Sequence, residues 1–130
     1  MLAVLLFGLS LISCTSPEER KTLEKLHQIA AETPVYLGFK EIGSHEGANS
    51  LNAVLSFYYR STASYEEVKV FYTKELTAKG WTGPRGEPTG DGTIGINFRR
   101  DEYAIAIYYD RSAVQDDDWN YAISYSWRIP

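Results

Sequence analysis

The strongest constraint on the fold is a series of three segments with alternating apolar and polar side chains near the end of the chain. They cover residues 93–100, 103–110 and 119–129, and only Asp101 and Glu102 separate the first two. Because neighbouring side chains on a strand point to opposite faces, and because so short a link permits only a tight turn, these segments predict an antiparallel meander with one apolar face. The last segment contributes most to that face, with Trp119, Tyr121, Ile123, Tyr125, Trp127 and Ile129.

A further strand and a helix are predicted upstream of the meander. Residues 51–60 alternate, and their apolar side comprises Leu51, Ala53, Leu55, Phe57 and Tyr59. Ser64 and Glu67 have the spacing of a capping box, which predicts a helix that runs to Lys79 and stops at Gly80. Trp81 then folds back as an apolar plug. The apolar stripe of this helix is formed by Tyr65, Val68, Phe71 or Tyr72, and Leu76.

An additional helix is predicted near the N-terminal end of the chain. Ser16 can cap it, Pro17 suits its first turn, and Glu19 completes a second capping box. The residue before a proline disfavours helix, so this helix should end near Glu32, before Thr33-Pro34. The alternative is a loosely packed stalk. The apolar face expected for a packed helix consists of Leu23, Leu26, Ile29 and Ala30.

The remaining segments are less regular. Residues 33–39 predict a short edge strand, residues 44–50 a turn, and residues 82–92, with four glycines and two prolines, a loop. Together these elements predict an α+β fold, a two-layer sandwich with an antiparallel sheet of four to five strands. One main helix packs on one face of the sheet, and the N-terminal helix is added to it.

The only cysteine of the chain follows an apolar run from Met1 to Ile12. This run is shorter than the roughly 20 residues that a spanning helix needs. Leu11-Ile12-Ser13-Cys14 resembles the lipobox of bacterial lipoproteins, although no Lys or Arg precedes Arg20. The resemblance implies cleavage before Cys14, a diacylglyceryl group on its thiol, and an acyl chain such as palmitate on its amine. The alternative is an unmodified cysteine after an ordinary apolar helix.

The lipobox resemblance also implies an organisation and a location. Residues 1–13 are the signal peptide, residues 14–33 the tether and N-terminal helix, and residues 34–130 the α+β domain. The partner implied is the lipid bilayer, reached through lipidated Cys14. In a host with two membranes, Thr15 rather than Asp after the cysteine implies the outer membrane, facing the periplasm. The net charge of −4 and the lack of a basic cluster argue against nucleic acid.

A second resemblance covers about half of the part after Cys14. Residues 33–39, 57–62 and 64–81 are similar to a small domain found in uncharacterised bacterial exported proteins. The shared pattern is an early turn, a strand that ends in a Tyr-rich run, and a capped helix closed by Gly80 and Trp81. Leu37 stands where that turn often has proline. The resemblance implies no catalytic residue.

The titratable residues do not form a catalytic or metal-binding pattern. His27 and the His45-Glu46 pair lack the convergent ligand spacing of a zinc site, so both histidines are expected at the surface. Asp110 and residues 116–118 form an acidic loop without the alternation of a calcium loop, so a solvated hairpin loop is expected, and calcium binding is the alternative. Residues 83–92 lack the Lys-Ser or Lys-Thr ending of a phosphate loop. We expect no enzymatic activity and no cofactor.

The aromatic residues are the remaining candidates for a binding site. Alternation places Tyr58 and Tyr108 on the polar face of the sheet, where exposed rings could stack on a sugar or anchor a peptide. Cross-strand packing is the alternative. The sequence therefore predicts a non-catalytic, lipid-anchored envelope protein that engages an envelope protein or a wall component, with a ligand-binding module as the alternative.

Overall fold

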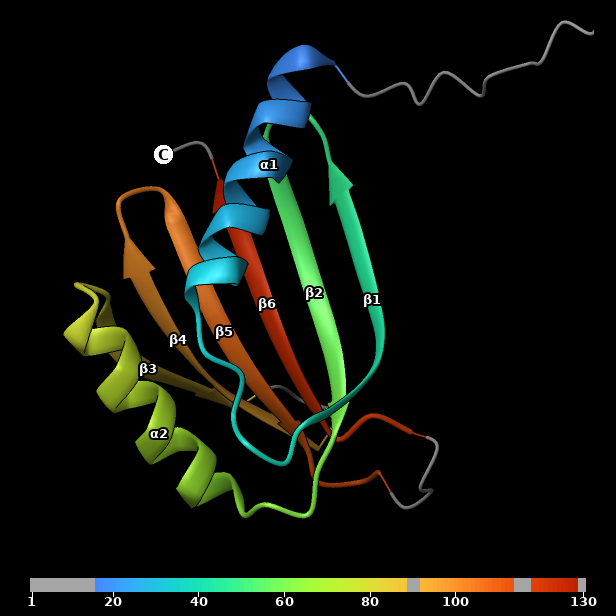
Figure 1. Ribbon diagram of the computed structural model, residues 1–130, viewed down its shortest axis with the longest axis vertical. Helices are drawn as coiled ribbons and strands as arrows, with labels where there is room; N and C mark the ends of the chain where they lie inside the picture. Colours follow the sequence, from blue (N-terminus) through green and yellow to red (C-terminus); the bar gives the residue numbers. More distant parts are fainter. Residues whose placement is uncertain (1–15, 89–91, 114–117, 129–130) are drawn as a thin grey trace, which may run out of the picture.

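The computed structural model describes residues 16–88, 92–113 and 118–128 as one antiparallel sheet with two helices on the same face (Figure 1). The sheet has six strands in the order β1-β2-β6-β5-β4-β3. The class is therefore α+β, as predicted, but the sheet is larger than the expected four to five strands. The elements are α1 (Pro17–Glu32), β1 (Lys40–Ala48), β2 (Asn52–Arg60), α2 (Tyr65–Ala78), β3 (Thr82–Pro88), β4 (Thr93–Arg100), β5 (Tyr103–Asp110) and β6 (Tyr121–Arg128).

The connection through α2 explains the strand order. It carries the chain from β2 across the sheet to the opposite edge, where β3 lies (Figure 1). The chain then returns strand by strand until β6 pairs with both β5 and β2. The predicted meander of β4, β5 and β6 is confirmed, and β4 and β5 have the predicted bounds. β6 begins at Tyr121, two residues later than expected.

The N-terminal helix is confirmed as a packed helix rather than a loose stalk. The Ser16 Oγ accepts a hydrogen bond from the Glu19 backbone N–H at 3.1 Å, and the Glu19 carboxylate accepts one from the Ser16 N–H at 3.2 Å. These bonds satisfy backbone donors that the first turn of a helix leaves free. On the inner side, Leu26 and Ile29 are buried against the sheet.

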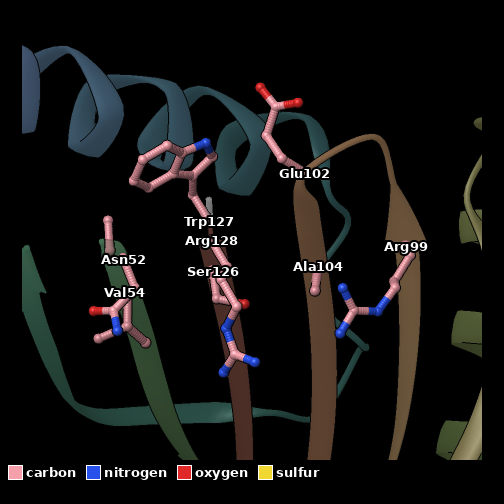
Figure 2. A pocket seen from close by; sticks show the side chains of 9 residues that line it. Asn52, Val54, Arg99, Glu102, Ala104, Ser126, Trp127 and Arg128 are labelled. Carbon is pink, nitrogen blue, oxygen red and sulfur yellow. The ribbon is translucent and has the colours of Figure 1, made fainter. Parts of the chain in front are cut away.

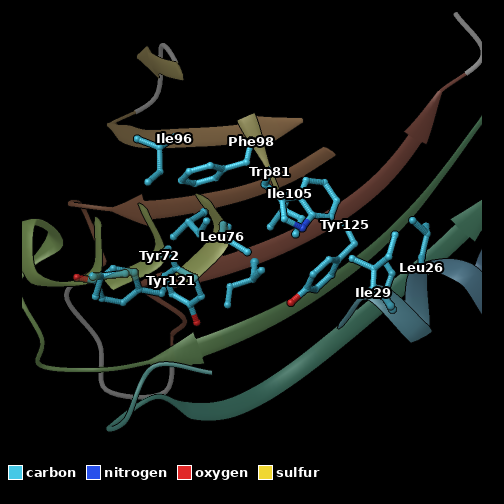
Figure 3. Close-up of a cluster of buried hydrophobic side chains, with 14 of the residues drawn as sticks. Leu26, Ile29, Tyr72, Leu76, Trp81, Ile96, Phe98, Ile105, Tyr121 and Tyr125 are labelled. Carbon is cyan, nitrogen blue, oxygen red and sulfur yellow. The ribbon is translucent and has the colours of Figure 1, made fainter. Parts of the chain in front are cut away.

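The core lies between the helices and the apolar face of the sheet (Figure 3). Val68, Tyr72 and Leu76 of α2 are buried, which confirms the predicted stripe. Trp81 folds back into the core as expected, and the Arg100 guanidinium lies 4.4 Å from its ring centroid. The strands contribute Ala53, Leu55, Tyr59, Ile96, Phe98, Ile105, Ile107, Tyr121, Ile123 and Tyr125.

The prediction of a loop over residues 82–92 is wrong for its first part, which forms the edge strand β3. Proline cannot donate to a sheet ladder, and an edge strand tolerates it because one side of its backbone has no partner strand. The pairing with β4 is irregular between Thr82 and Arg85. Gly83 lies in this irregular part at φ +152°, and a Cβ there would come within 2.7 Å of the Asn97 carbonyl oxygen.

The predictions for residues 33–39 and for residues 44–48 are also wrong, whereas residues 49 and 50 lie in a turn as expected. Residues 33–39 form no strand, and the turn at Leu37-Gly38, with Gly38 at φ +98°, is closed by a hydrogen bond from Phe39 N–H to the Tyr36 carbonyl. The Phe39 ring packs 4.8 Å from the Tyr121 ring, so this segment covers the sheet instead of joining it. The strand β1 follows and includes residues 44–48, which were expected in a turn.

Candidate functional site

The face of the sheet away from the helices carries small side chains along its central strands. We call it the open face, because none of the described helices covers it (Figure 1). Ser56 of β2 and Ser124 of β6 face each other there, with 2.7 Å between their hydroxyl oxygens. The register continues the small side chains into β5, through Ala104 and Ala106.

Tyr58 and Tyr108 lie on the open face, as predicted, on either side of Ala122. Both are half-buried. The Tyr58 ring lies 5.3 Å from the Trp119 ring, and the Tyr108 ring covers Gly95, where a Cβ would come within 2.8 Å of it. Trp119 was expected on the core face, but it precedes β6 and reaches the ring on the other face. Packing against neighbouring residues therefore covers part of the Tyr58 and Tyr108 rings.

The open face also carries a pocket at one end of the strands (Figure 2). Its volume is about 310 Å³. Arg99 pairs in register with Ala104, which pairs with Ser126, so an arginine stands beside a floor of small side chains. Arg128 follows on β6, opposite Asn52. The lining residues include Asn52, Val54, Arg99, Glu102, Ala104, Ser126 and Arg128.

The two arginines are the chemically distinctive groups of this pocket. Figure 2 shows the Arg99 guanidinium directed from β4 toward Ala104, the Arg128 side chain along β6, and the Glu102 carboxylate pointing away from the strands. Both arginines are exposed, and neither side chain forms an ion pair or hydrogen bond with another described residue. Arg100 differs, because its guanidinium packs on Trp81 and donates to the Lys79 carbonyl at 3.2 Å. Arg99 and Arg128 are therefore available to an anion.

Both histidines are exposed, as expected, and His45 does not point the same way as its neighbour Glu46. His45 lies on the open face opposite Ser56, whereas Glu46 points to the helix side. There the Glu46 carboxylate lies 3.2 Å from Nε2 of His27, which links β1 to α1. Within residues 16–88, 92–113 and 118–128, no three His, Cys, Asp or Glu side chains gather in a way that could hold a metal ion.

The acidic loop falls partly outside the described residues. Asp110 is described, and its carboxylate accepts hydrogen bonds from the Ser112 backbone N–H at 2.9 Å and from the Ser112 hydroxyl at 2.7 Å. Asp118 is exposed. Asp116, Asp117, Ile129, the segment 89–91 and the whole lipobox with Cys14 lie outside the described residues.

The buried tyrosines on the core side have structural hydrogen bonds. The Tyr72 hydroxyl accepts from the Tyr36 backbone N–H at 3.0 Å, and the Tyr121 hydroxyl donates to the Ala63 carbonyl at 2.7 Å. Burial raises the pKa of both hydroxyls well above the ordinary tyrosine value. They therefore stay neutral and act as donors and acceptors rather than as bases.

A second surface feature is apolar. We use the name Leu37–Val70 patch for the exposed side chains of Val35 and Leu37 in the turn after α1, together with exposed Val70 and half-buried Phe71 on α2. Leu37 is 94% exposed and Val70 66% exposed. The Tyr36 ring meets the Phe71 ring edge-on at 5.2 Å, which joins the turn after α1 to α2. A shallow hollow beside it is lined by Glu66, Glu67, Val70 and Phe71.

Sequence reasoning missed the arginine pocket, although alternation alone assigns Arg99 and Arg128 to the polar face. No described helix is both long enough and apolar enough to cross a bilayer. Comparison with curated proteins gave no match, and comparison with solved structures gave none either. A family model described as START domain-like matches residues 44–118, a stretch from β1 into the segment before β6. Because this match spans more than half of the chain, the protein belongs to the START domain-like family.

Proposed function

We propose that the protein is a non-catalytic, lipid-anchored component of the bacterial cell envelope that binds a ligand on the open face of its sheet. The observation that carries the binding part is the pocket of about 310 Å³, in which two guanidinium groups lack a partner among the described residues. A charged donor at a concave surface binds an acceptor more strongly than a neutral one does. The START domain-like family is compatible with a ligand-binding fold.

The anchoring part is supported by the segment Leu11 to Cys14. A diacylglyceryl group carries two acyl chains, and two chains give stable membrane attachment where one gives only marginal binding. The helix α1 begins at Pro17, so little chain separates Cys14 from the folded part. Attachment through Cys14 therefore keeps the domain beside the membrane. Where the host has two membranes, the anchor lies in the outer membrane and the domain faces the periplasm.

The ligand part can be tested with a panel of sugars, peptides and phosphate esters. We expect phosphate esters to raise the unfolding temperature of the protein, because they fit paired guanidinium groups. The variant Ala104→Leu fills the pocket without changing any charge, and Ala106→Leu makes the same change outside the residues that line it. We expect Ala104→Leu to abolish the stabilisation by phosphate esters and Ala106→Leu to preserve it. If no compound of the panel is stabilising, or if both variants respond alike, the pocket is not the binding site.

The anchoring part needs a separate test, in the bacterium that expresses the full chain. Mass spectrometry should find Cys14 diacylated and at the N-terminus, and the protein should sediment with membranes. The variant Cys14→Ala should lose both properties, whereas Ser10→Ala, outside the lipobox, should keep them. A Cys14→Ala protein that stays equally membrane-bound would refute lipid anchoring.

A second candidate function is favoured by the Leu37–Val70 patch. Exposed apolar clusters on a folded domain are typical of protein-binding surfaces. The helix α2 and the turn that follows α1, which carry the patch, lie away from the N-terminal end of α1 (Figure 1), so a partner could reach the patch while the chain stays anchored. Photo-crosslinking from position 37 in the envelope should then trap one protein, and Val70→Asp should prevent it. Ile42→Asp, which changes an exposed apolar residue on β1, is the control.

A further inference from the structure

We propose that the Arg99–Arg128 pocket binds the phosphate of phospholipid head groups in the membrane to which the protein is attached, so that this end of the sheet faces the bilayer. The inference rests on the proposed lipidation of Cys14. It assigns the ligand of the open-face pocket to one chemical class and gives the domain a defined orientation. Four observations support it: the position of the pocket, the length of the tether, the chemistry of the lining residues, and an exposed apolar residue nearby.

The pocket residues lie at the start of β2 and at the ends of β4 and β6, and these strand ends are at the same end of the molecule as the start of α1 (Figure 1). The first turn of α1 meets the β1–β2 turn and the end of β6, where Ser16, Thr22, Asn49 and Trp127 line one small hollow. Trp127 also lines the arginine pocket. One residue of β6 therefore connects the attachment point of the tether to the pocket, and Arg128 is its direct neighbour.

The tether is too short to let this end move far from the bilayer. Cys14 precedes Ser16 by two residues, so their Cα atoms can be at most about 7 Å apart. The head-group region of a bilayer is itself several ångströms deep, about 5–8 Å on each side. Acyl chains on Cys14 would therefore hold the first turn of α1, and with it the end of β6, at head-group level.

The lining residues suit a phosphate group. Arg99 lies on β4 and Arg128 on β6, and β5 lies between them, so the two strands are about 10 Å apart. The long arginine side chains can converge over the floor formed by Ala104 and Ser126. Guanidinium groups form paired hydrogen bonds to phosphate oxygens. The Ser126 hydroxyl and the Asn52 amide add neutral donors to the same pocket.

The charges nearby select among head groups. Glu102 lines the pocket, and Asp101, Glu18 and Glu19 lie at the same end of the fold. The Glu19 carboxylate is engaged in capping α1. This end is therefore no basic patch, and diffuse attraction to an anionic surface does not explain binding. Binding therefore depends on the two guanidinium groups at the phosphate, and the Glu102 carboxylate, which points away from the strands (Figure 2), disfavours a head group with a net negative charge.

An apolar residue reaches out beside the pocket. Leu51 was expected on the apolar side of its strand, but it precedes β2 and is 64% exposed. The Asn49 side chain accepts hydrogen bonds from the backbone N–H groups of Leu51 and Asn52, at 2.8 and 2.9 Å, and fixes this turn. At head-group level an exposed leucine can insert among the lipids, which accounts for its exposure.

The orientation can be measured on the mature, lipidated protein in vesicles of phosphatidylethanolamine and phosphatidylglycerol. Cys14 is the sole cysteine, so lipidation leaves an introduced cysteine as the only free thiol. We expect a fluorophore at Ser50→Cys to be quenched by lipids that carry a spin label on the head group. The same fluorophore at Thr62→Cys, exposed after β2 at the other end of the sheet, should not be quenched. Equal quenching at both positions would overturn the orientation.

The role of the arginines needs matched charge variants. Arg99→Gln with Arg128→Gln should reduce quenching at position 50, whereas Arg85→Gln, on the same face of β3, should not. In co-sedimentation of the unlipidated Cys14→Ala chain with the same vesicles, the double variant should bind about 25-fold more weakly, about 5-fold for each guanidinium. All these arginines are exposed, so circular dichroism should show the folds intact. Double and control variants that behave alike would refute head-group binding.

The two proposals fail in different ways. An unmodified Cys14 in the mass spectrum refutes anchoring but leaves the co-sedimentation comparison valid as a test of head-group binding. A lipidated protein with no difference between the arginine variants refutes head-group binding and leaves anchoring intact. Soluble glycerophosphoethanolamine distinguishes the source of the phosphate. If it binds the unlipidated chain as tightly as the vesicles do, the ligand is a free phosphate ester and the membrane assignment is wrong.

Discussion

The side chain of Asn120 makes a buried interaction whose strength can be measured directly. Its Oδ1 accepts a hydrogen bond from the Ser61 backbone N–H at 2.9 Å, and its Nδ2 donates one to the Ser61 carbonyl at 2.7 Å. Ser61 is only 8% exposed. The Asn120 side-chain amide therefore satisfies both backbone groups of Ser61, as a neighbouring strand would, at the residue that follows β2. The same hydrogen bonds fix the position of Asn120, and the ring of its neighbour Trp119 packs against Tyr58 on the open face.

The variant Asn120→Ala leaves both backbone groups of Ser61 buried without these partners. An unsatisfied buried donor or acceptor costs about 1–3 kcal/mol, so the free energy of unfolding should fall by about 2–4 kcal/mol. Asn49→Ala is the matched control. Asn49 also makes two side-chain hydrogen bonds to backbone N–H groups, but it is exposed and water can replace it. Its loss should stay within about 1 kcal/mol.

Urea unfolding followed by circular dichroism gives the comparison. With a slope of about 1–3 kcal/mol per molar urea, Asn120→Ala should lower the midpoint by roughly 1–2 M at an unchanged slope. Asn49→Ala should shift it far less. Equal midpoints for the two variants would show that burial of Ser61 does not set the strength of the interaction, and the argument from unsatisfied groups would be refuted.

Three further predictions follow from the same contacts. Gly83→Ala places a Cβ 2.7 Å from a backbone oxygen at φ +152° and should cost about 2 kcal/mol or more in thermal unfolding, whereas Gly86→Ala on the same strand meets nothing closer than 4.0 Å and should be nearly neutral. Glu102→Gln should tighten co-sedimentation with vesicles of pure phosphatidylglycerol about 5-fold, and an unchanged affinity would remove Glu102 from the pocket chemistry. Burial, aided by the charge of Glu41, raises the pKa of Tyr59 to about 12, so the folded protein favours the neutral hydroxyl. The stabilisation is complete below the unfolded value of about 10 and is lost as pH rises toward 12, at about 1.4 kcal/mol per pH unit for this residue. Tyr59→Phe should therefore weaken the loss of stability above pH 10 measured in urea.

The elements that the sequence predicted well are those with local signals. The capping residues Ser16 and Ser64 accept the hydrogen bonds expected of them. The tight turn at Asp101 fixes the pairing of β4 with β5, because a two-residue link leaves only one register. In each case the residues that decide the structure lie within a few positions of one another, so a single sequence is sufficient.

The elements that were missed are the two edge strands, which have no such local signal. β1 carries two glycines and has no apolar alternation, and it is a strand because the edge of β2 offers it backbone partners. β3 contains prolines and glycines that are typical of a loop, and an edge position makes them acceptable. Tertiary pairing decides both cases, and propensity within a short window does not report it.

In the arginine pocket, local sequence signals place one arginine, whereas tertiary pairing places the other. Alternation and the turn at Asp101 place Arg99 on the open face beside Ala104. The link between β5 and β6 is long and does not fix their register, and a shift of two residues would keep every apolar side chain on the core side. Such a shift would move Arg128 by one row relative to Arg99 and change the spacing between the two guanidinium groups. The observed register is held by contacts at the far end of β6, where the Asn120 carbonyl accepts from the Asp110 N–H and its side chain holds Ser61. Asn120→Ala should therefore also weaken phosphate binding, because the contacts of Asn120 at one end of β6 position Arg128 at the other end.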